Sequence, residues 1–550
     1  MEGHTPRGGA RRASRVIRAC ALAALLWAAP AAAQSDSAGA LVDRARQAAQ
    51  ADRNREAADL FEAALGMAPD RRRDVLREWA DQLTYSDRAA RAVPLYREVL
   101  GWEADPRRLR WARLGLGLAL SWSGQKREAQ REYEALIAQD PSDTDARMGR
   151  ARVLGWRDRP GEAREEYLRI LAARPDALEA RRELARVQWW RGRPRDAQRR
   201  LLELAAQNPE DADTRLLLAA VQSALGRPDQ ARATTRSLLS RDPGHRRAGE
   251  MERDLVLGTR PSTRVQQYGS EQSNGLDMRT ATAEQRFRPG GGRGDVDLRY
   301  EFQSASPESG EDGVRVHRPG VHVRHRLGRD AEANAAVHGE LIRPEGAAPE
   351  RDEVSYDAWL TLWPADVLRV DASTRRAVFD DLRSLRTGIT GTYAGLSADF
   401  TPTEKVRVTG RASAGRFSDD NSQRWGQLEG ERRVLSHPRT WVGARFTAID
   451  LARSTGNGYF EPQDFRATVA TLRAHDRIGE RFWWDVEGAY GREDTRDGVP
   501  KPNWNAGARA SYLVTRRTEL EARYFYFSSL EGNSGGFARG SLRVGLRQAW

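Results

Sequence analysis

The chain carries two patterns of apolar and polar positions, and one replaces the other near residue 260. Before this point, segments such as GQKREAQREYEALIAQDP and RPGEAREEYLRILAARPD repeat apolar residues every three and four positions, the spacing of one helix face. After it, runs such as DVDLRYEFQ alternate apolar and polar residues, the spacing of a strand with one polar face. The patterns predict a helical first part and a second part made of strands.

The helical part repeats with a fixed period. Prolines recur at Pro69, Pro106, Pro141, Pro175, Pro209 and Pro243, and the last three steps are each 34 residues. Alanines keep the same period at Ala129, Ala163, Ala197 and Ala231. A 34-residue period is typical of tetratricopeptide repeats, in which each unit is a pair of packed helices. We therefore predict an α-solenoid of about five repeats over residues 40–250, followed by a linker at 251–262.

One position of the repeat is aromatic. Trp122, Trp156 and Trp190 lie one period apart near the end of each unit's first helix, and Tyr85 takes this place in the earliest unit. Because the first helices of such units line the concave surface, these side chains are candidate ligand-binding residues that stack on sugar rings. The alternative is that each ring packs against the neighbouring unit, a common use of buried aromatic area.

The second part contains about sixteen alternating runs between residues 263 and 550, at roughly 18 residues per strand and turn. A β-sandwich, a propeller and a closed membrane barrel would each satisfy half-polar strands. Long runs, and aromatic residues near the run ends, favour an antiparallel transmembrane β-barrel with aromatic girdles. These aromatics are Trp359, Trp363, Trp441, Trp483, Trp484, Tyr524 and Tyr526. The predicted fold class is α+β multidomain, an α-solenoid followed by a barrel of about 16 strands.

The beginning of the chain supports export. Five arginines precede an apolar stretch at 19–29, and Ala31-Ala32-Ala33 follows it, the pattern of a secretory signal peptide over residues 1–33. The single cysteine, Cys20, lies in this segment, so the mature chain has no disulfides and no thiolate ligands. We expect an outer-membrane protein of a Gram-negative bacterium, with the repeats in the periplasm and no nucleic acid partner.

The chain is basic, with a formal net charge of +12. Alternation places ten arginines on the polar, inward face of the predicted barrel: Arg299, Arg324, Arg369, Arg407, Arg411, Arg445, Arg509, Arg523, Arg543 and Arg547. A wet lumen with an arginine excess favours an anionic or hydroxyl-rich polymer. The alternative is that these charges pair with carboxylates across strands and only fill the barrel.

The last strand ends on an aromatic residue. In SLRVGLRQAW, Leu542, Val544, Leu546 and Trp550 face one side, and Arg543 and Arg547 face the other. Bacterial barrel-assembly machinery recognises final strands of this kind, so Leu546 and Trp550 form a predicted assembly signal. The same outward side chains are expected to contact outer-membrane lipid.

Convergent catalytic or metal-binding residues are not evident. GNSGG at 532–536 satisfies a hydrolase pattern by letter, but it lies between two strands instead of on a strand-to-helix turn. His322 and His325 are three residues apart and face opposite sides of a strand, which disfavours a shared metal ion. We expect no cofactor and no enzymatic activity.

The combination of a signal peptide, repeats with turns such as LSWSG around Trp122, and a barrel ending in Trp550 resembles the YaiO-type outer-membrane barrel family. The layout is similar to that of the secretion porins for cellulose and poly-N-acetylglucosamine. The resemblance implies repeats that bind a glycan or a periplasmic protein, and a barrel that serves as a conduit or accessory for exopolysaccharide export. A non-conducting scaffold that recruits a periplasmic partner is the alternative.

Overall fold

The computed structural model describes residues 31–550 except 273–274, 308–311, 380, 458, 460, 495–499 and 530–536. The predicted signal peptide lies outside the described residues up to residue 30, and GNSGG lies wholly outside them. The chain divides into two compact units, Met1–Leu184 and Ala185–Trp550.

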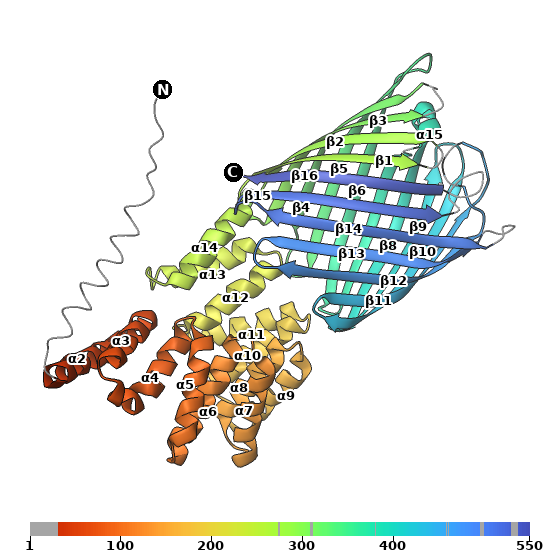
Figure 1. Ribbon diagram of the computed structural model, residues 1–550. Helices are drawn as coiled ribbons and strands as arrows, with labels where there is room; N and C mark the ends of the chain where they lie inside the picture. The colour runs from red at the N-terminus through yellow and green to blue at the C-terminus, as the bar shows by residue number, and fades with distance from the viewer. Residues whose placement is uncertain are drawn as a thin grey trace, which may run out of the picture. The chain divides into compact units, whose positions relative to one another are not determined.

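The first unit is helical. Its elements are α2 Ala31–Gln50, α3 Asn54–Met67, η1 Pro69–Arg71, α4 Arg72–Tyr85, α5 Ala89–Trp102, α6 Pro106–Trp122, α7 Lys126–Gln139, α8 Thr144–Trp156, α9 Pro160–Ala173 and the first part of α10, Leu178–Trp190 (Figure 1). The second unit continues with α11 Pro194–Gln207, α12 Ala212–Ala224, α13 Pro228–Leu239 and α14 Arg246–Thr259. Among the described residues, none of these helices is long and apolar enough to span a membrane.

Glycine and tyrosine meet where neighbouring helices pack in the first unit. Tyr133 of α7 is 4 % exposed. A Cβ atom added to Gly117 of α6 would lie 2.7 Å from its ring, and one added to Gly149 of α8 would lie 2.3 Å from it. The periodic alanines are fully buried as well. Small residues at these positions let successive helices approach closely enough to enclose one aromatic ring.

Helix α14 occupies most of the segment that the sequence predicts as a linker. It runs over Arg246–Thr259 and packs Ala248 and Leu255 against α12 and α13. The expected linker at 251–262 is therefore helical up to residue 259, and β1 begins at residue 262. The repeat pattern of the sequence did not indicate α14, because this helix has no following partner helix in the repeat.

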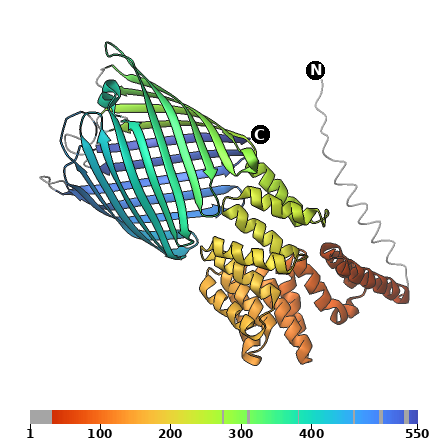
Figure 2. The same cartoon turned by 180° about the vertical axis from the view of Figure 1, so that it is seen from behind.

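The remainder of the second unit is a closed barrel in which consecutive strands pair antiparallel and β1 pairs with β16. Figures 1 and 2 show its wall from opposite sides. Its strands are β1 Ser262–Gln272, β2 Leu276–Phe287, β3 Gly294–Pro307, β4 Val314–Arg326, β5 Ala331–Pro344, β6 Arg351–Ala365, β7 Leu368–Val378, β8 Thr390–Thr403, β9 Val406–Phe417, β10 Ser422–Ser436, β11 Arg439–Leu451, β12 Phe465–Ile478, β13 Phe482–Asp494, β14 Lys501–Leu513, β15 Thr518–Ser529 and β16 Phe537–Ala549. The predicted solenoid and 16-strand antiparallel barrel are confirmed.

The strand register separates an inward from an outward face. Residues directly opposite one another in paired strands share a face, as Arg523, Arg543 and Tyr268 do across β15, β16 and β1. The outward face is apolar and exposed, for example at Leu298 and Leu472. Such a belt is what lipid contact requires.

Several aromatics expected in the outer girdle lie inside instead. Trp359, Trp441 and Trp483 take inward positions in the register. Arg407 lies 5.1 Å over the ring of Trp441, and Arg477 lies 5.0 Å over that of Trp483. For these three residues the girdle prediction is wrong, because proximity to a run end does not determine the face and inward rings gain cation–π contacts. Trp363 lies where the register shifts, with Arg195 4.6 Å over its ring. Trp484, Tyr524 and Tyr526 take outward positions.

The two ends of the barrel differ in their connections. The chain enters β1 and leaves β16 at the end where connections such as 366–367, 404–405 and 437–438 are short, here called the short-turn end. The opposite, long-loop end carries the connections 379–389 and 452–464. Short helix α15, Leu382–Thr387, lies in the first of these loops (Figure 1).

Candidate functional site

The barrel encloses a cavity of about 1170 Å³. Nine arginines line it: Arg264, Arg299, Arg318, Arg375, Arg376, Arg509, Arg523, Arg539 and Arg543. Only five carboxylates do so, from Glu284, Glu301, Glu340, Asp357 and Glu521. The lining of the cavity thus has an excess of four positive charges among the described residues.

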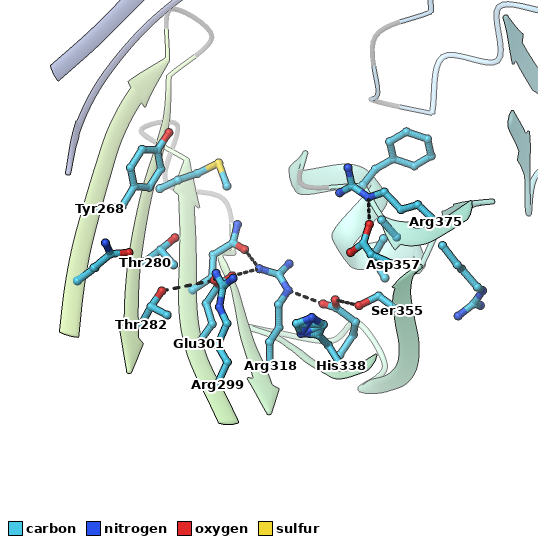
Figure 3. A pocket seen from close by; sticks show the side chains of 18 of the residues that line it. Tyr268, Thr280, Thr282, Arg299, Glu301, Arg318, His338, Ser355, Asp357 and Arg375 are labelled. Atoms are coloured by element: carbon cyan, nitrogen blue, oxygen red, sulfur yellow. Dashed lines mark hydrogen bonds and ion pairs between the residues drawn. The ribbon is translucent and has the colours of Figure 1, made fainter. Parts of the chain in front are cut away.

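On the wall formed by β3 to β6, the charges are paired. Arg318 is largely buried and bridges Glu301 and Glu340, with 2.9 Å between its Nη1 and the Glu301 Oε1 (Figure 3). The Ser355 hydroxyl donates to Glu340 at 2.6 Å. The two carboxylates compensate the charge of the buried guanidinium, and removal of one partner would leave an uncompensated charge. This wall therefore has its acidic groups occupied by the protein itself.

The strands place all ten predicted arginines on the inward face. Eight lie near a carboxylate: Arg299 at Glu301, Arg324 at Asp295, Arg369 at Asp371, Arg407 at Glu431, Arg445 at Glu429, Arg509 at Glu521, Arg523 at Glu487 and Arg547 at Glu519. Arg411 donates to the amide oxygen of Gln427 at 3.3 Å. Arg543 differs, because its recorded side-chain contact is the ring of Tyr268. Carboxylates thus pair with eight of the ten, across strands for six and within one strand for Arg299 and Arg369.

At the long-loop end, the described residues of the loops 379–389 and 452–464 form a cap inside the barrel. Leu385 of α15 is fully buried against inward residues such as Val316 and Ile342. Beside it, Phe379 stacks on Tyr459 at 4.6 Å. The cap places apolar side chains inside this end of the barrel and bounds part of the cavity, since Phe379 also lines it.

Polar contacts hold the second cap loop. The carboxylate of Asp419, in the turn after β9, accepts hydrogen bonds from the Tyr459 hydroxyl at 2.7 Å and from the Asn457 amide at 2.8 Å. Partial burial would raise the pKa of Asp419, but these hydrogen bonds outweigh it and hold the pKa below its usual value. The charged form of Asp419 therefore fastens the loop.

The sequence analysis missed the cap, although two local signals were present. Asp381 precedes α15 and accepts a hydrogen bond from the Ser384 backbone N–H at 2.8 Å, and Gly388 ends the helix in a left-handed conformation. These are the usual residues for the two ends of a helix. What the sequence did not indicate is that the loop turns into the barrel.

At the short-turn end, the last repeat helices contact the barrel turns. The Asp366 carboxylate accepts hydrogen bonds from the backbone N–H groups of Arg195 and Asp196 at 3.0 and 2.9 Å. Helix α11 has no capping side chain of its own, so a residue from the β6–β7 turn supplies the cap. Arg193 donates to the Pro402 carbonyl, and Arg326 pairs with Asp229 at 2.9 Å. Helices α11 and α13 are thus fixed to the barrel.

The structure treats the four predicted repeat aromatics differently. Tyr85 and Trp122 are exposed and meet edge to face, with ring centroids 5.7 Å apart. Trp190 is 37 % exposed, whereas Trp156 is half-buried against the apolar core of the first unit. Trp156 therefore has a packing role, while Tyr85 and Trp122 present a free aromatic surface.

The closing strand is fixed to the first one. Trp550 is exposed, and its indole N–H donates to the Thr263 hydroxyl at 2.9 Å, while its backbone N–H donates to the Pro261 carbonyl. Leu546 lies on the outward face opposite Val265. The last residue therefore holds the seam between β16 and β1 from the outside.

In the described part of the chain, no group of three or more His, Cys, Asp or Glu side chains is placed to hold a metal ion. His322 stacks on Trp359 and lies 3.4 Å from Asp297. His325 follows at an opposite-facing position of β4.

Comparison with known proteins covers both parts of the chain. Residues 298–487 match the PgaA membrane beta barrel domain. Tetratricopeptide repeat models match residues 114–177, 157–213 and 191–254. A closed barrel, part of which matches the PgaA membrane beta barrel domain, therefore follows tetratricopeptide repeats, in accord with an outer-membrane protein. No curated protein matches the chain.

Solved structures resemble the chain at low identity. A "Bacterial polysaccharide outer membrane secretin" is 13% identical, covers 53% of this chain and 99% of its own, and gives a TM-score of 0.44. A tetratricopeptide repeat protein from Parabacteroides merdae is 15% identical, covers 40% of this chain and 87% of its own, and gives a TM-score of 0.33. A thermophilic tetratricopeptide repeat protein from Thermus thermophilus is 16% identical, covers 34% of this chain and 99% of its own, and gives a TM-score of 0.31.

The barrel therefore contains a charged lumen whose lining differs from one region to another. One wall has neutralised charges, the long-loop end has an apolar cap, and the seam has arginines on aromatic rings. Such a lumen is suited to hold a polar chain rather than an apolar ligand.

Proposed function

We propose that this protein is an outer-membrane conduit or accessory for exopolysaccharide export, whose periplasmic repeats dock a glycan or a protein partner. The observation that carries the proposal is the large polar lumen of a closed PgaA-type barrel that directly follows a repeat array. The resemblance in layout to secretion porins points to the same role. The proposal assigns transport and binding to the protein, without catalysis.

The orientation in this proposal follows from the connections. Outer-membrane barrels have short periplasmic turns and longer extracellular loops. Helix α14 leads into β1 at the short-turn end, so the repeats belong on the periplasmic side. The cap then lies at the extracellular mouth, and Leu546 and Trp550 lie where barrel-assembly machinery acts. Outward apolar residues contact the lipid.

We place the docking surface of the repeats at Tyr85 and Trp122. Their rings are exposed in the first unit, where a sugar ring or an apolar side chain of a periplasmic protein can stack on them.

A second candidate is a non-conducting scaffold that recruits a periplasmic partner. The cap favours it, because Leu385 and Ser384 are fully buried and the apolar cluster around Leu385 lies inside one end of the barrel. In that case the barrel would anchor the repeats and transport nothing.

Single-channel recording of the full chain in planar bilayers separates the two candidates. The key variant is Leu385→Asp, which places a charge in a fully buried apolar site and should displace the cap. Thr387→Asp, on the exposed side of the same helix, is the matched control. The conduit predicts a current that rises in Leu385→Asp but not in the control, and that oligosaccharides block. Folded barrels without current in all three forms would support the scaffold.

A further inference from the structure

The seam between the last strands and the first differs from the rest of the lumen. Three guanidinium groups lie over aromatic rings there: Arg523 at 5.8 Å from the Phe525 centroid, and Arg539 and Arg543 at 5.7 and 5.6 Å from that of Tyr268. These five residues are called the seam patch. They come from β15, β16 and β1, and the register aligns Arg523, Arg543 and Tyr268 side by side.

On its long-loop side, the seam patch has no carboxylate beside Arg539 and Arg543 among the described inward residues, whereas Glu521 lies on its short-turn side and pairs with Arg509. From the level of Arg543 to the long-loop end, the described inward positions of β15, β16, β1 and β2 carry serine, glutamine, threonine, phenylalanine and apolar residues, with no Asp or Glu. Arg523 alone reaches an acid, Glu487 of β13, at 2.9 Å. The wall of β3 to β6 shows the opposite arrangement, with Arg318 between two carboxylates.

The positive charges on the seam oppose one another. Arg523 and Arg543 are direct cross-strand partners, and like charges at such positions destabilise a sheet. Cation–π contacts offset part of this cost. Arg539 donates to the Tyr268 hydroxyl at 2.7 Å, yet its buried Nε has no hydrogen-bond partner among the described residues. A bound anion would offset the repulsion between Arg523 and Arg543 and would give the Nε of Arg539 a hydrogen-bond acceptor.

The geometry points to an anionic polysaccharide as the substrate, and we propose that the seam patch binds its acidic groups. This inference rests on the proposed function in export and specifies the charge class of the polymer. A guanidinium binds a carboxylate with two parallel hydrogen bonds, and an adjacent aromatic ring offers a face for the sugar. Both elements are present at Tyr268 with its two arginines.

The patch also continues along the lumen. Arg547, Arg543 and Arg539 are spaced four residues apart on β16, about 13 Å per step at the rise of a strand. They run from the short-turn end toward the long-loop end, so successive acidic sugars can contact successive arginines. Arg547 already pairs with Glu519, but a neutral polymer would leave the charges of Arg539 and Arg543 without an anionic partner, and a cationic polymer would be repelled.

Titration calorimetry on the full chain in detergent tests the inference with three oligosaccharides of matched length: oligogalacturonate, a cello-oligosaccharide and a chitosan oligomer. We expect oligogalacturonate to bind at least tenfold more tightly than the neutral oligomer and the chitosan oligomer to bind most weakly. The affinity for oligogalacturonate should fall as salt rises, since the contact is between charges.

The double variant R539Q/R543Q should lower the affinity for oligogalacturonate about tenfold or more, since it removes two charge-assisted contacts to the acidic groups. The matched control R299Q/R375Q removes the same charge from the lumen but at arginines that face Glu301 and Asp357. It should reduce binding much less. Heat-modifiable mobility on gels checks that both variants fold.

The outcomes separate this inference from the proposed function. Equal binding of all three oligosaccharides, preference for the chitosan oligomer, or equal losses in the two double variants would overturn the seam patch while leaving a conduit intact. Binding of no oligosaccharide, together with no current in the bilayer, would overturn the proposed function itself.

Discussion

The contact between Asp366 and helix α11 gives a prediction with a defined size. Asp366→Ala removes a carboxylate that is 4 % exposed and accepts two backbone hydrogen bonds from the first turn of α11. Loss of an N-terminal capping residue costs about 0.5–2 kcal/mol, and hydrogen bonds to a charged group contribute about 1.5–3 kcal/mol. Because these terms overlap, we expect a loss of about 2–3 kcal/mol in the stability of this contact.

Hydrogen exchange measures this loss directly at the amides involved. A change of about 2–3 kcal/mol corresponds to roughly 30- to 150-fold faster exchange, at 1.36 kcal/mol per factor of ten. The increase should be greatest at the N–H groups of Arg195 and Asp196, which lose their acceptor. The outward apolar strands should keep their protection, because the barrel closes without this contact.

Asp330→Ala is the matched control. Asp330 also pairs with Arg195, at 2.9 Å, but its side chain is 54 % exposed. Exposed ion pairs contribute about 0–1 kcal/mol, so exchange at α11 should rise by less than about fivefold. Unchanged exchange in Asp366→Ala, or an equal effect in both variants, would refute the role of Asp366 as the cap of α11.

Three further predictions concern packing, pH and ligand contact. Gly149→Ala should destabilise the first unit by about 1–3 kcal/mol, because the new methyl group meets the ring of Tyr133, whereas Gly161→Ala has open space and should be neutral or stabilising; thermal melts of the two variants test this. The lowered pKa of Asp419 stabilises the cap above the ordinary aspartate value of about 3.9, and this contribution is lost as pH falls through the lowered value. The single-channel current through the barrel should therefore rise only at acid pH. The Asp419→Asn variant should not show this rise. Trp122→Ala should weaken binding of the repeat ligand without lowering the melting temperature by more than a few degrees, because the side chain is 48 % exposed.

The sequence predicts those features that depend on local periodicity. A 34-residue period and strict alternation identified the solenoid and the sixteen strands, because each element repeats its own burial pattern. Alternation also placed all ten arginines on the inward face, since a strand determines the side of each residue once one side is known.

Features that depend on contacts between distant segments were not predictable in this way. The pairing of Arg318 with two glutamates needs the registers of β3, β4 and β5 together. The cap needs the loop 379–389 to meet Val316 and Ile342, which read as ordinary strand residues. Trp156 also looked identical to Trp122 in the repeat, yet only Trp156 packs against a core, because its surroundings differ.

The position of the seam patch links recognition to the completion of folding. Its residues come from the first strand of the barrel and from the last two, which are separated by almost the whole length of the domain. Tyr268 meets Arg539 and Arg543 only when β16 pairs with β1, and Trp550 fastens that joint. A barrel that has not closed therefore lacks the contact of Tyr268 with its two arginines, so closure of the barrel completes the patch.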